Sequence, residues 1–380
     1  MPREVRKKSG IPLIAELAGV SIGTVDRALH GRAGINPRTL KRVLKVAQDI
    51  GYTPNVAARA LSTGKHVRIG VCVPKELAYF YDEMWAGIRE EAARYEPRGV
   101  EFVFAAVPEL GKGEGSAFHK LRACKVDGIL LTPGNPEIMA PLIDAAEKEG
   151  TRVVCVSTDA PLSRRSSVVC VEPRLNGLIA GELMADFVPH GSKVAIVTGM
   201  LKTIDHREKA EGFTASFRDL SMGGAVVEVV EAHEHPTESF RKTRALLERV
   251  PDLAGIYVNT VNCLPVCRAL AQADLVRKVR VIATDLFRKM IPAIESGAIA
   301  ASIYQQPYVQ GQLAVRALAE HLLHASQLNP TQYLNPSIIL RANLNLFREA
   351  TLISRPRANQ RAVGGTPLRQ YPNSPIALLN

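Results

Sequence analysis

Apolar residues near the start of the chain recur at helical spacing and predict three short helices. Two of them, within residues 14–30, are joined by a tight turn at Gly19, where a side chain would crowd the backbone. Ser21 can cap the second helix through its hydroxyl, and Asn36 and Pro37 begin the third as its cap and first residue. The residues expected to face inward are Ile14, Leu17, Ala18, Val25, Ala28, Leu29, Leu40, Val43, Leu44 and Ala47.

From residue 67 onward, apolar runs of strand length alternate with amphipathic stretches of helical length. Such alternation is typical of parallel sheets that are covered by helices on both faces. The number of strands suits two similar lobes better than one large sheet. The expected strands are residues 67–73, 101–106, 128–131, 152–156, 194–198, 226–231, 255–258, 280–283 and 300–303.

Polar and aromatic residues gather in the loops that follow these strands, where pockets open in folds of this kind. Aromatic rings stack on the apolar face of a sugar, and carboxylates and amides pair with its hydroxyl groups. The alternative interpretation is that they are ordinary helix caps and turns, since polar residues are common in strand–helix loops. The candidate ligand-binding residues are Phe80, Tyr81, Asp159, His206, Lys209, Asn259, Asn262, Asp285 and Gln305.

Positive charge is concentrated at the start of the chain. Residues 1–68 hold 13 Lys and Arg and 4 Asp and Glu, a net charge of +9, whereas the whole chain carries +11. Such a segment favours a polyanion such as DNA, because neutralised phosphates release counterions. A membrane surface would attract the same charge, but no run approaches about 20 apolar residues and the N-terminus lacks the apolar core of a signal peptide. We therefore expect a cytoplasmic protein with no membrane partner.

The second helix is expected to turn Thr24, Arg27 and His30 outward. These residue types contact base edges and phosphates in the major groove of DNA. On these residues alone, a two-helix corner of an ordinary globular domain is the alternative. The charge of the segment favours the DNA-binding interpretation.

Two sequence blocks carry a resemblance to a known family. Ala-x-x-Ala-Gly-Val-Ser-x-x-Thr-Val-x-Arg-x-Leu occupies residues 15–29, and Gly-Tyr-x-Pro-Asn-x-x-Ala-Arg-x-Leu occupies residues 51–61. In this order and separation, they closely resemble the lactose-repressor (LacI/GalR) family of bacterial transcription regulators. The resemblance implies a recognition helix near residues 21–30 and a hinge helix near residues 55–61, with Leu61 wedged into the minor groove. The DNA-contacting residues that it implies are Ser21, Ile22, Gly23, Thr24, Arg27, His30, Asn55, Arg59 and Leu61.

Three residues of the head depart from this family's pattern. Ile22 and Gly23 stand where family members often place residues that read bases, and neither can form a bidentate hydrogen bond. Asp26 places a carboxylate where a small polar residue is usual. The operator sequence is therefore left open, and DNA shape can contribute to its recognition.

The body, residues 67–345, looks like the ribose-binding type of periplasmic receptor that this repressor family carries. Lys209 replaces an arginine of that receptor, and Ala160 and Pro173 stand where related receptors often place Arg and Asn. These departures argue against a plain pentose and leave a sugar, a polyol or a sugar acid as the implied effector. The positions that match sugar-binding residues of the receptor are Phe80, Tyr81, Asp159, Asn259, Asp285 and Gln305.

The sequence lacks the signatures of catalysis and metal binding. Residues 111–115 are rich in glycine but lack the Ser or Thr and the helix of a nucleotide site, and no nucleophile elbow occurs. Cys263 and Cys267 have no second Cys/His pair at a suitable spacing, and His233 and His235 stand in a polar loop. We expect no enzyme, no metal and no cofactor. The six cysteines are interpreted as structural thiols.

The expected fold is an all-α helix-turn-helix head followed by an α/β effector domain of two lobes with parallel sheets. The expected function is sequence-specific regulation of transcription, as a repressor, by a homodimer on a pseudo-palindromic operator under the control of a small ligand. A sugar receptor or an enzyme without a DNA role is the alternative, and a receptor conflicts with the basic head. The expected segments are residues 1–53 (head), 54–65 (hinge helix and linker), 66–348 (effector domain, with lobes 66–173 plus 304–333 and 174–303 plus 334–348) and 349–380 (extended or disordered tail).

Overall fold

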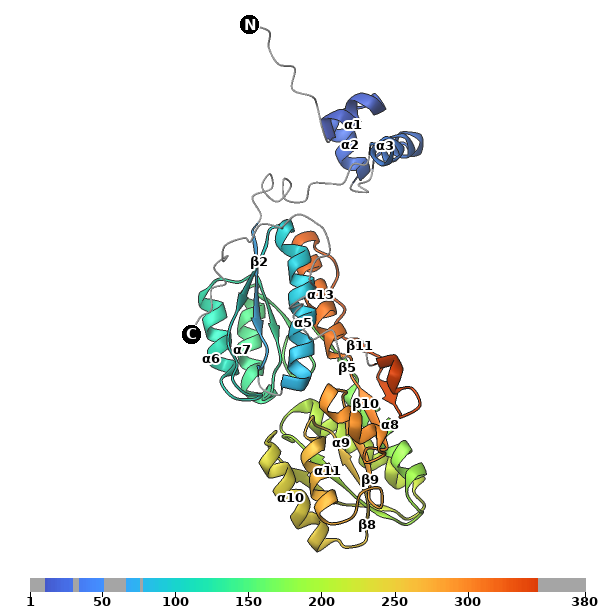
Figure 1. Cartoon of the computed structure of the whole chain (residues 1–380). Coiled ribbons are helices and arrows are strands. Elements are labelled where there is room, and N and C mark those ends of the chain that lie inside the picture. The colour runs from blue at the N-terminus through green and yellow to red at the C-terminus, as the bar shows by residue number, and fades with distance from the viewer. Residues whose placement is uncertain (1–10, 30–33, 51–65, 76–77, 348–380) are drawn as a thin grey trace, which may run out of the picture. The chain divides into compact units, whose positions relative to one another are not determined.

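The computed structural model describes residues 11–29, 34–50, 66–75 and 78–347 (Figure 1). The chain divides into two compact units, residues 1–65 and 66–380. Some of the residues and segments predicted above lie outside the described part of the chain. They are His30, the hinge helix and linker 54–65 with Asn55, Arg59 and Leu61, and the tail 349–380.

The described residues of the first unit form three helices, with both predicted caps in place. The Ser21 hydroxyl accepts the Thr24 N–H at 3.2 Å, and the Asn36 side chain accepts the Arg38 N–H at 2.9 Å. Gly19 adopts φ +62° in the turn between the first two helices. The helices are α1 Ile11–Ala18, α2 Ile22–Leu29 and α3 Pro37–Asp49. The core consists of Ile14, Ala15, Ala18, Val25, Ala28, Val43 and Ala47.

Two leucines that were expected in this core, Leu17 and Leu44, are instead exposed (56% and 46%). Helix α1 begins at Ile11, so its inward stripe follows positions 11, 14, 15 and 18. Each helical residue turns about 100° from the last, which places Ala15 in this stripe and Leu17 outside it. The prediction for both leucines was therefore wrong.

Two six-stranded sheets form the second unit, and we call the halves built on them the first and second lobes (Figure 1). The first sheet has the order β11-β5-β4-β3-β1-β2 and is parallel throughout. The second has the order β12-β10-β9-β8-β6-β7 and is parallel except between β10 and β12. The strands are β1 Val67–Cys72, β2 Val100–Phe104, β3 Gly128–Leu131, β4 Arg152–Val156, β5 Ser167–Val171, β6 Lys193–Thr198, β7 Ala225–Glu231, β8 Leu253–Val258, β9 Arg280–Thr284, β10 Ala301–Tyr304, β11 Gln332–Leu334 and β12 Ser337–Ile339.

Helices cover the sheets, and every residue of the central strand β3 is buried. The α-helices are α5 Ala78–Tyr95, α6 Glu114–Ala123, α7 Pro136–Lys148, α8 Pro173–Phe187, α9 Ile204–Leu220, α10 Pro236–Arg249, α11 Cys263–Gln272, α12 Ile291–Glu295 and α13 Pro307–His324. Short 3-10 helices span Glu96–Arg98, Arg288–Met290 and Leu344–Phe347.

The chain passes between the two lobes three times. Strand β5 belongs to the first sheet, whereas α8, which follows it, packs on β8 and β9 of the second. Strand β10 belongs to the second sheet, whereas α13 packs on β3, β4 and β5 of the first. The third crossing joins β11 to β12. Residues that follow strands of both sheets therefore reach one cavity.

Each of the nine predicted strands is confirmed, with ends that differ by no more than two residues. Strands β5, β11 and β12 were not predicted. A loop rather than a helix joins β4 to β5, so the alternation of strand and helix breaks there. Strands β11 and β12 have three residues each and are held by partners far away in sequence. Their formation depends on tertiary pairing rather than on a local pattern.

Candidate functional site

A cavity in the second unit collects residues from both lobes. They follow β1, β2 and β4 in the first lobe and β6 to β10 in the second, as the topology of parallel sheets favours. Its free volume is about 30 Å³. The lining residues are Phe80, Tyr81, Leu110, Ser157, Thr158, Thr203, Asp205, His206, Lys209, Glu234, Asn259, Thr260, Val261, Asp285 and Gln305.

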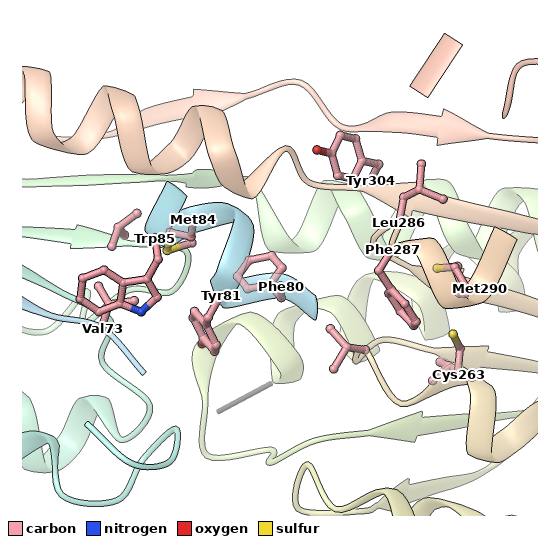
Figure 2. Close-up of a cluster of buried hydrophobic side chains, with 14 of the residues drawn as sticks. Val73, Phe80, Tyr81, Met84, Trp85, Cys263, Leu286, Phe287, Met290 and Tyr304 are labelled. Carbon is pink, nitrogen blue, oxygen red and sulfur yellow. The ribbon is translucent and has the colours of Figure 1, made fainter. Parts of the chain in front are cut away.

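Phe80 and Tyr81 lie near the start of α5 (Figure 2) and form an aromatic wall of the cavity. Their rings meet edge to face, with 5.1 Å between the centroids. Behind them lie the buried Met84 and Trp85, and Trp85 Nε1 donates to the carbonyl of Pro74 at 3.0 Å. The packed core thus holds both aromatic rings in a fixed position.

Lys209 on α9 places a buried cation at the cavity, with only 1% of the residue exposed. Its ammonium donates to Asp205 Oδ2, one turn earlier, at 2.7 Å. Helix α8 approaches α9 closely here, since a Cβ atom added at Gly177 would lie 2.1 Å from the Lys209 carbonyl oxygen. A glycine contact between two helices therefore positions the helix that carries this ion pair.

Glu234, in the loop after β7, is a fully satisfied buried carboxylate. It accepts from His206 Nε2 at 3.0 Å, from Asn262 Nδ2 at 3.1 Å and from the Thr260 hydroxyl. Burial is the largest single influence and by itself would raise the pKa of Glu234. The hydrogen bonds from His206 and Thr260 and the charges of His206 and Lys209 together outweigh it and bring the pKa below its ordinary value. His206 Nδ1 in turn accepts the Met200 N–H at 3.1 Å, so in this geometry the ring proton is on Nε2.

Asp285, which directly follows β9, combines backbone strain with an incompletely satisfied carboxyl group. Its φ is +69°, a region that residues other than glycine seldom adopt. Its two carboxyl oxygens share one side-chain amide, Gln305 Nε2, at 3.1 and 3.0 Å. Burial raises the pKa of Asp285 to about 7, and Lys209 and Gln305 offset this only in part. Strain and a perturbed pKa at a cavity mark a candidate functional residue.

Among the described residues that line the cavity, three carry a buried polar atom without a hydrogen-bond partner. These atoms are Asp205 Oδ1, Asn259 Oδ1 and Thr158 Oγ1. The Asn259 amide is oriented by its own donation to the His206 carbonyl at 3.0 Å. An unpartnered buried polar atom costs about 1–3 kcal/mol, so these atoms indicate a site that a bound molecule completes.

Seven of the nine predicted ligand-binding residues line the cavity, and Asp159 and Asn262 do not. Asp159 is ion-paired with Arg165, whose Nη2 lies 2.7 Å from Asp159 Oδ2. The side-chain amide of Asn262 donates to the Glu234 carboxylate. The lining residues absent from the predicted set are Leu110, Ser157, Thr158, Thr203, Asp205, Glu234, Thr260 and Val261, of which Glu234 and Thr260 add polar groups to the second lobe. Their places shortly after two predicted strands were the available signal.

Helix α2 presents a polar and exposed face of the first unit. Thr24 is half-buried, and its hydroxyl lies 2.9 Å from that of Ser21. Val25 and Ala28 are buried and anchor the opposite face of the helix. The exposed residues on this segment are Ser21, Ile22, Gly23 and Arg27. A single guanidinium among small and apolar neighbours can approach a phosphate or a base edge.

The described part of the chain contains no group of three His, Cys, Asp or Glu residues that could hold a metal ion. Cys263 and Cys267 lie on α11, where burial raises the pKa of Cys267 to about 12. His233 pairs with Glu238 at 3.0 Å. Within the same residues, no helix is both long and apolar enough to cross a membrane.

Two families of known proteins match this chain in adjoining segments. The lacI family of bacterial regulatory proteins matches residues 12–55, and the periplasmic binding protein domain matches residues 69–326. The catabolite control protein A of Priestia megaterium is 25% identical over 249 residues, which cover 65% of this chain and 72% of that protein. The HTH-type transcriptional regulator DegA of Bacillus subtilis is 29% identical over 215 residues, or 56% of this chain and 61% of that protein.

Solved structures show the fold of the second unit. An ABC transporter solute-binding protein from Burkholderia graminis, in complex with D-arabinose, has a TM-score of 0.68 at 22% identity and covers 74% of this chain and 97% of its own. GanP, a glucose-galactose binding protein from Geobacillus stearothermophilus, has a TM-score of 0.67 at 23% identity and covers 74% and 99%. With the helical unit, the two parallel sheets and both family matches, this chain belongs to the lacI family of bacterial regulatory proteins and is a DNA-binding transcriptional regulator with a periplasmic-binding-protein domain.

Proposed function

We propose that this chain is a homodimeric repressor whose affinity for operator DNA is set by a small hydroxyl-rich ligand in the cavity. The observation that carries the proposal is that residues with buried, unpartnered polar atoms line a cavity that is also lined by two aromatic rings. The hydroxyl groups of a ligand would form hydrogen bonds with these atoms, while the ring of the ligand stacks on Phe80 or Tyr81. The D-arabinose in the solved relative supports the same class of ligand.

The proposed ligand-binding residues are the predicted residues that line the cavity. Asp205 and Thr158 are added because each has a buried side-chain oxygen without a hydrogen-bond partner. Because these residues come from both lobes, a ligand that contacts all of them favours the closed arrangement of the lobes. A change in the lobes would alter the DNA affinity of the paired heads. The coupling would be reciprocal, so operator DNA would change the ligand affinity by the same factor.

On the DNA side, we propose that α2 enters the major groove with Arg27 as its main cation. Two copies of the chain would place two such helices on the halves of a pseudo-palindromic site. Asn55, Arg59 and Leu61 remain proposed contacts in the minor groove. The net charge of +9 in residues 1–68 supports a strong electrostatic contribution.

An electrophoretic shift titration tests the proposal on the full chain, with DNA from the neighbourhood of its own gene. The expected result is selective binding that weakens steeply with salt and changes when a stabilising sugar, found by thermal-shift screening, is added. Light scattering on the same sample is expected to give the mass of a dimer. Binding that ignores both DNA sequence and salt contradicts the proposal.

A further inference from the structure

Acidic groups outnumber basic groups in the cavity. Asp205, Glu234 and Asp285 line it together with Lys209 and His206. Even if His206 is protonated, it balances Glu234 while Lys209 balances Asp205, at 3.0 and 2.7 Å. Asp285 is then left with a neutral amide, that of Gln305, as the side chain that holds it. Burial raises the pKa of Asp285 to about 7, and the charge of Lys209, which is ion-paired with Asp205, lowers it only in part.

The first lobe adds no charge to the cavity. Its lining residues are Phe80, Tyr81, Leu110, Ser157 and Thr158. The neighbouring Asp159 is outside the lining, and its ion pair with Arg165 removes both charges from the site. The cavity is therefore polarised, with an aromatic and hydroxyl wall in the first lobe and an acidic wall in the second.

The unpartnered atoms on the acidic wall are acceptors. Asp205 Oδ1 and Asn259 Oδ1 are buried and require donors from a bound molecule. A carboxylate or phosphate on the ligand would supply no donor and would add negative charge to a buried site. A neutral sugar would satisfy the acceptors but would leave Asp285 without a cation. A protonated amine supplies donors and charge together.

We propose that the ligand is an amino sugar or aminated polyol whose ammonium group faces Asp205 and Asp285 and whose ring carbons stack on Phe80 and Tyr81. This ligand class rests on the proposed function, because the cavity is taken as the effector site. This proposal excludes sugar acids as ligands and predicts that a neutral sugar binds with lower affinity than its amino counterpart.

The test compares ligands of one size that differ in charge. D-glucosamine, D-glucose and D-glucuronate, and the three galactose counterparts, are titrated into the full chain by calorimetry at about pH 6.5. We expect one amino sugar to bind at least about tenfold more tightly than its neutral counterpart, and neither uronate to bind. A neutral sugar that binds as tightly as its amine, a uronate that binds, or no binding of any of the six overturns the proposal.

A matched pair of variants shows whether charge causes the preference. Asp205→Asn removes a carboxylate from the acidic wall at nearly constant size, so the ratio of amine to neutral affinity is expected to fall at least about fivefold. Asp159→Asn makes the same change outside the lining and is expected to leave the ratio as it is. An unchanged ratio in a folded Asp205→Asn variant contradicts charge matching. If Asp205→Asn does not fold, Asp285→Asn serves as the test variant in its place, with the same expected fall in the affinity ratio.

Operator binding of the ligand-free chain is measured in parallel, because it separates the two proposals. Selective DNA binding together with a preference for neutral sugars overturns the ligand class and leaves the function intact. A preference for amines without any selective DNA binding overturns the function and leaves the ligand class intact.

Discussion

At the residue scale, the two acids Glu234 and Asp285 differ in how many partners the protein gives them. Glu234 has three side-chain donors, whereas Asp285 shares one side-chain amide between its two oxygens. A satisfied buried carboxylate holds its neighbours in place, and a poorly satisfied one retains interaction free energy for a ligand. We therefore expect Glu234 to shape the acidic wall and Asp285 to contact the ligand.

The raised pKa of Asp285 predicts how stability depends on pH. Because the folded-state pKa is about 7 and the ordinary value is 3.8, the folded chain keeps a proton that the unfolded chain has lost, and stability falls as pH rises through 7. Asp285→Asn imitates the protonated acid and removes this loss. Without ligand, it should stabilise the chain by roughly 2 kcal/mol more at about pH 8.5 than at about pH 5.5, as measured by urea denaturation.

Asp252→Asn is the matched control for this measurement. Asp252 is an exposed acid whose pKa is lowered by the hydrogen bond from Lys193. Its substitution should therefore not stabilise the chain at high pH. Equal stabilisation by Asp285→Asn at both pH values would show that Asp285 titrates normally.

At the element scale, close contact between α8 and α9 places the buried ion pair at the cavity. Gly177 and Gly212 lie at this contact, and a Cβ atom at either would come within 2.2 Å of a backbone oxygen of the other helix. The absence of side chains at these two positions lets the helices approach. The place of Lys209 therefore depends on α8 as well as on α9.

Gly177→Ala tests this dependence. A methyl group at 2.1 Å from the Lys209 carbonyl must push the helices apart, which costs about 1–3 kcal/mol and outweighs the gain in helix propensity. We expect a lower melting temperature and weaker ligand binding, measured by calorimetry. Gly115→Ala on α6, where the nearest atom is 3.7 Å away, should be neutral or slightly stabilising. Wild-type ligand affinity in Gly177→Ala would contradict this account.

Helix α2 is the element that should determine operator affinity. Arg27 is exposed on it and contributes nothing to the core of the first unit. Arg27→Ala is expected to weaken operator binding by about 1–3 kcal/mol and to leave the ligand affinity unchanged, by gel shift and calorimetry. Arg244→Ala, an exposed arginine on α10 of the second unit, is the control. Equal losses in both variants would mean that general charge, and not α2, determines the affinity.

At the scale of the whole molecule, little free space remains between the residues of both lobes that line the cavity. A free volume of about 30 Å³ holds one water molecule rather than a monosaccharide. The Thr203 hydroxyl, before α9, donates to the carbonyl of Gly134, after β3, at 2.7 Å and so joins the two lobes. We therefore expect ligand entry to require that the lobes separate and that this hydrogen bond breaks.

Thr203→Val removes this bond while the size of the side chain is kept. A neutral hydrogen bond contributes about 0.5–1.5 kcal/mol, so lobe opening should become easier, and we expect ligand association and dissociation to be roughly two- to tenfold faster in stopped-flow measurements. Thr214→Val breaks a hydroxyl bond to the Ala210 carbonyl within α9 and is the matched control. Unchanged rates in Thr203→Val would show that this contact does not limit opening.

The sequence by itself determined nine of the strands, the helical head and the strand ends at which the cavity opens, because periodicity and capping are local properties. Tertiary structure decided the pairing of β5, β11 and β12 and the direction in which each acid points. Asp159 turns to Arg165, whereas Glu234, in a loop that reads as merely polar, turns to His206 and Thr260. A buried carboxylate is oriented by the donors around it, and those around Glu234 come from parts of the chain that only folding brings together.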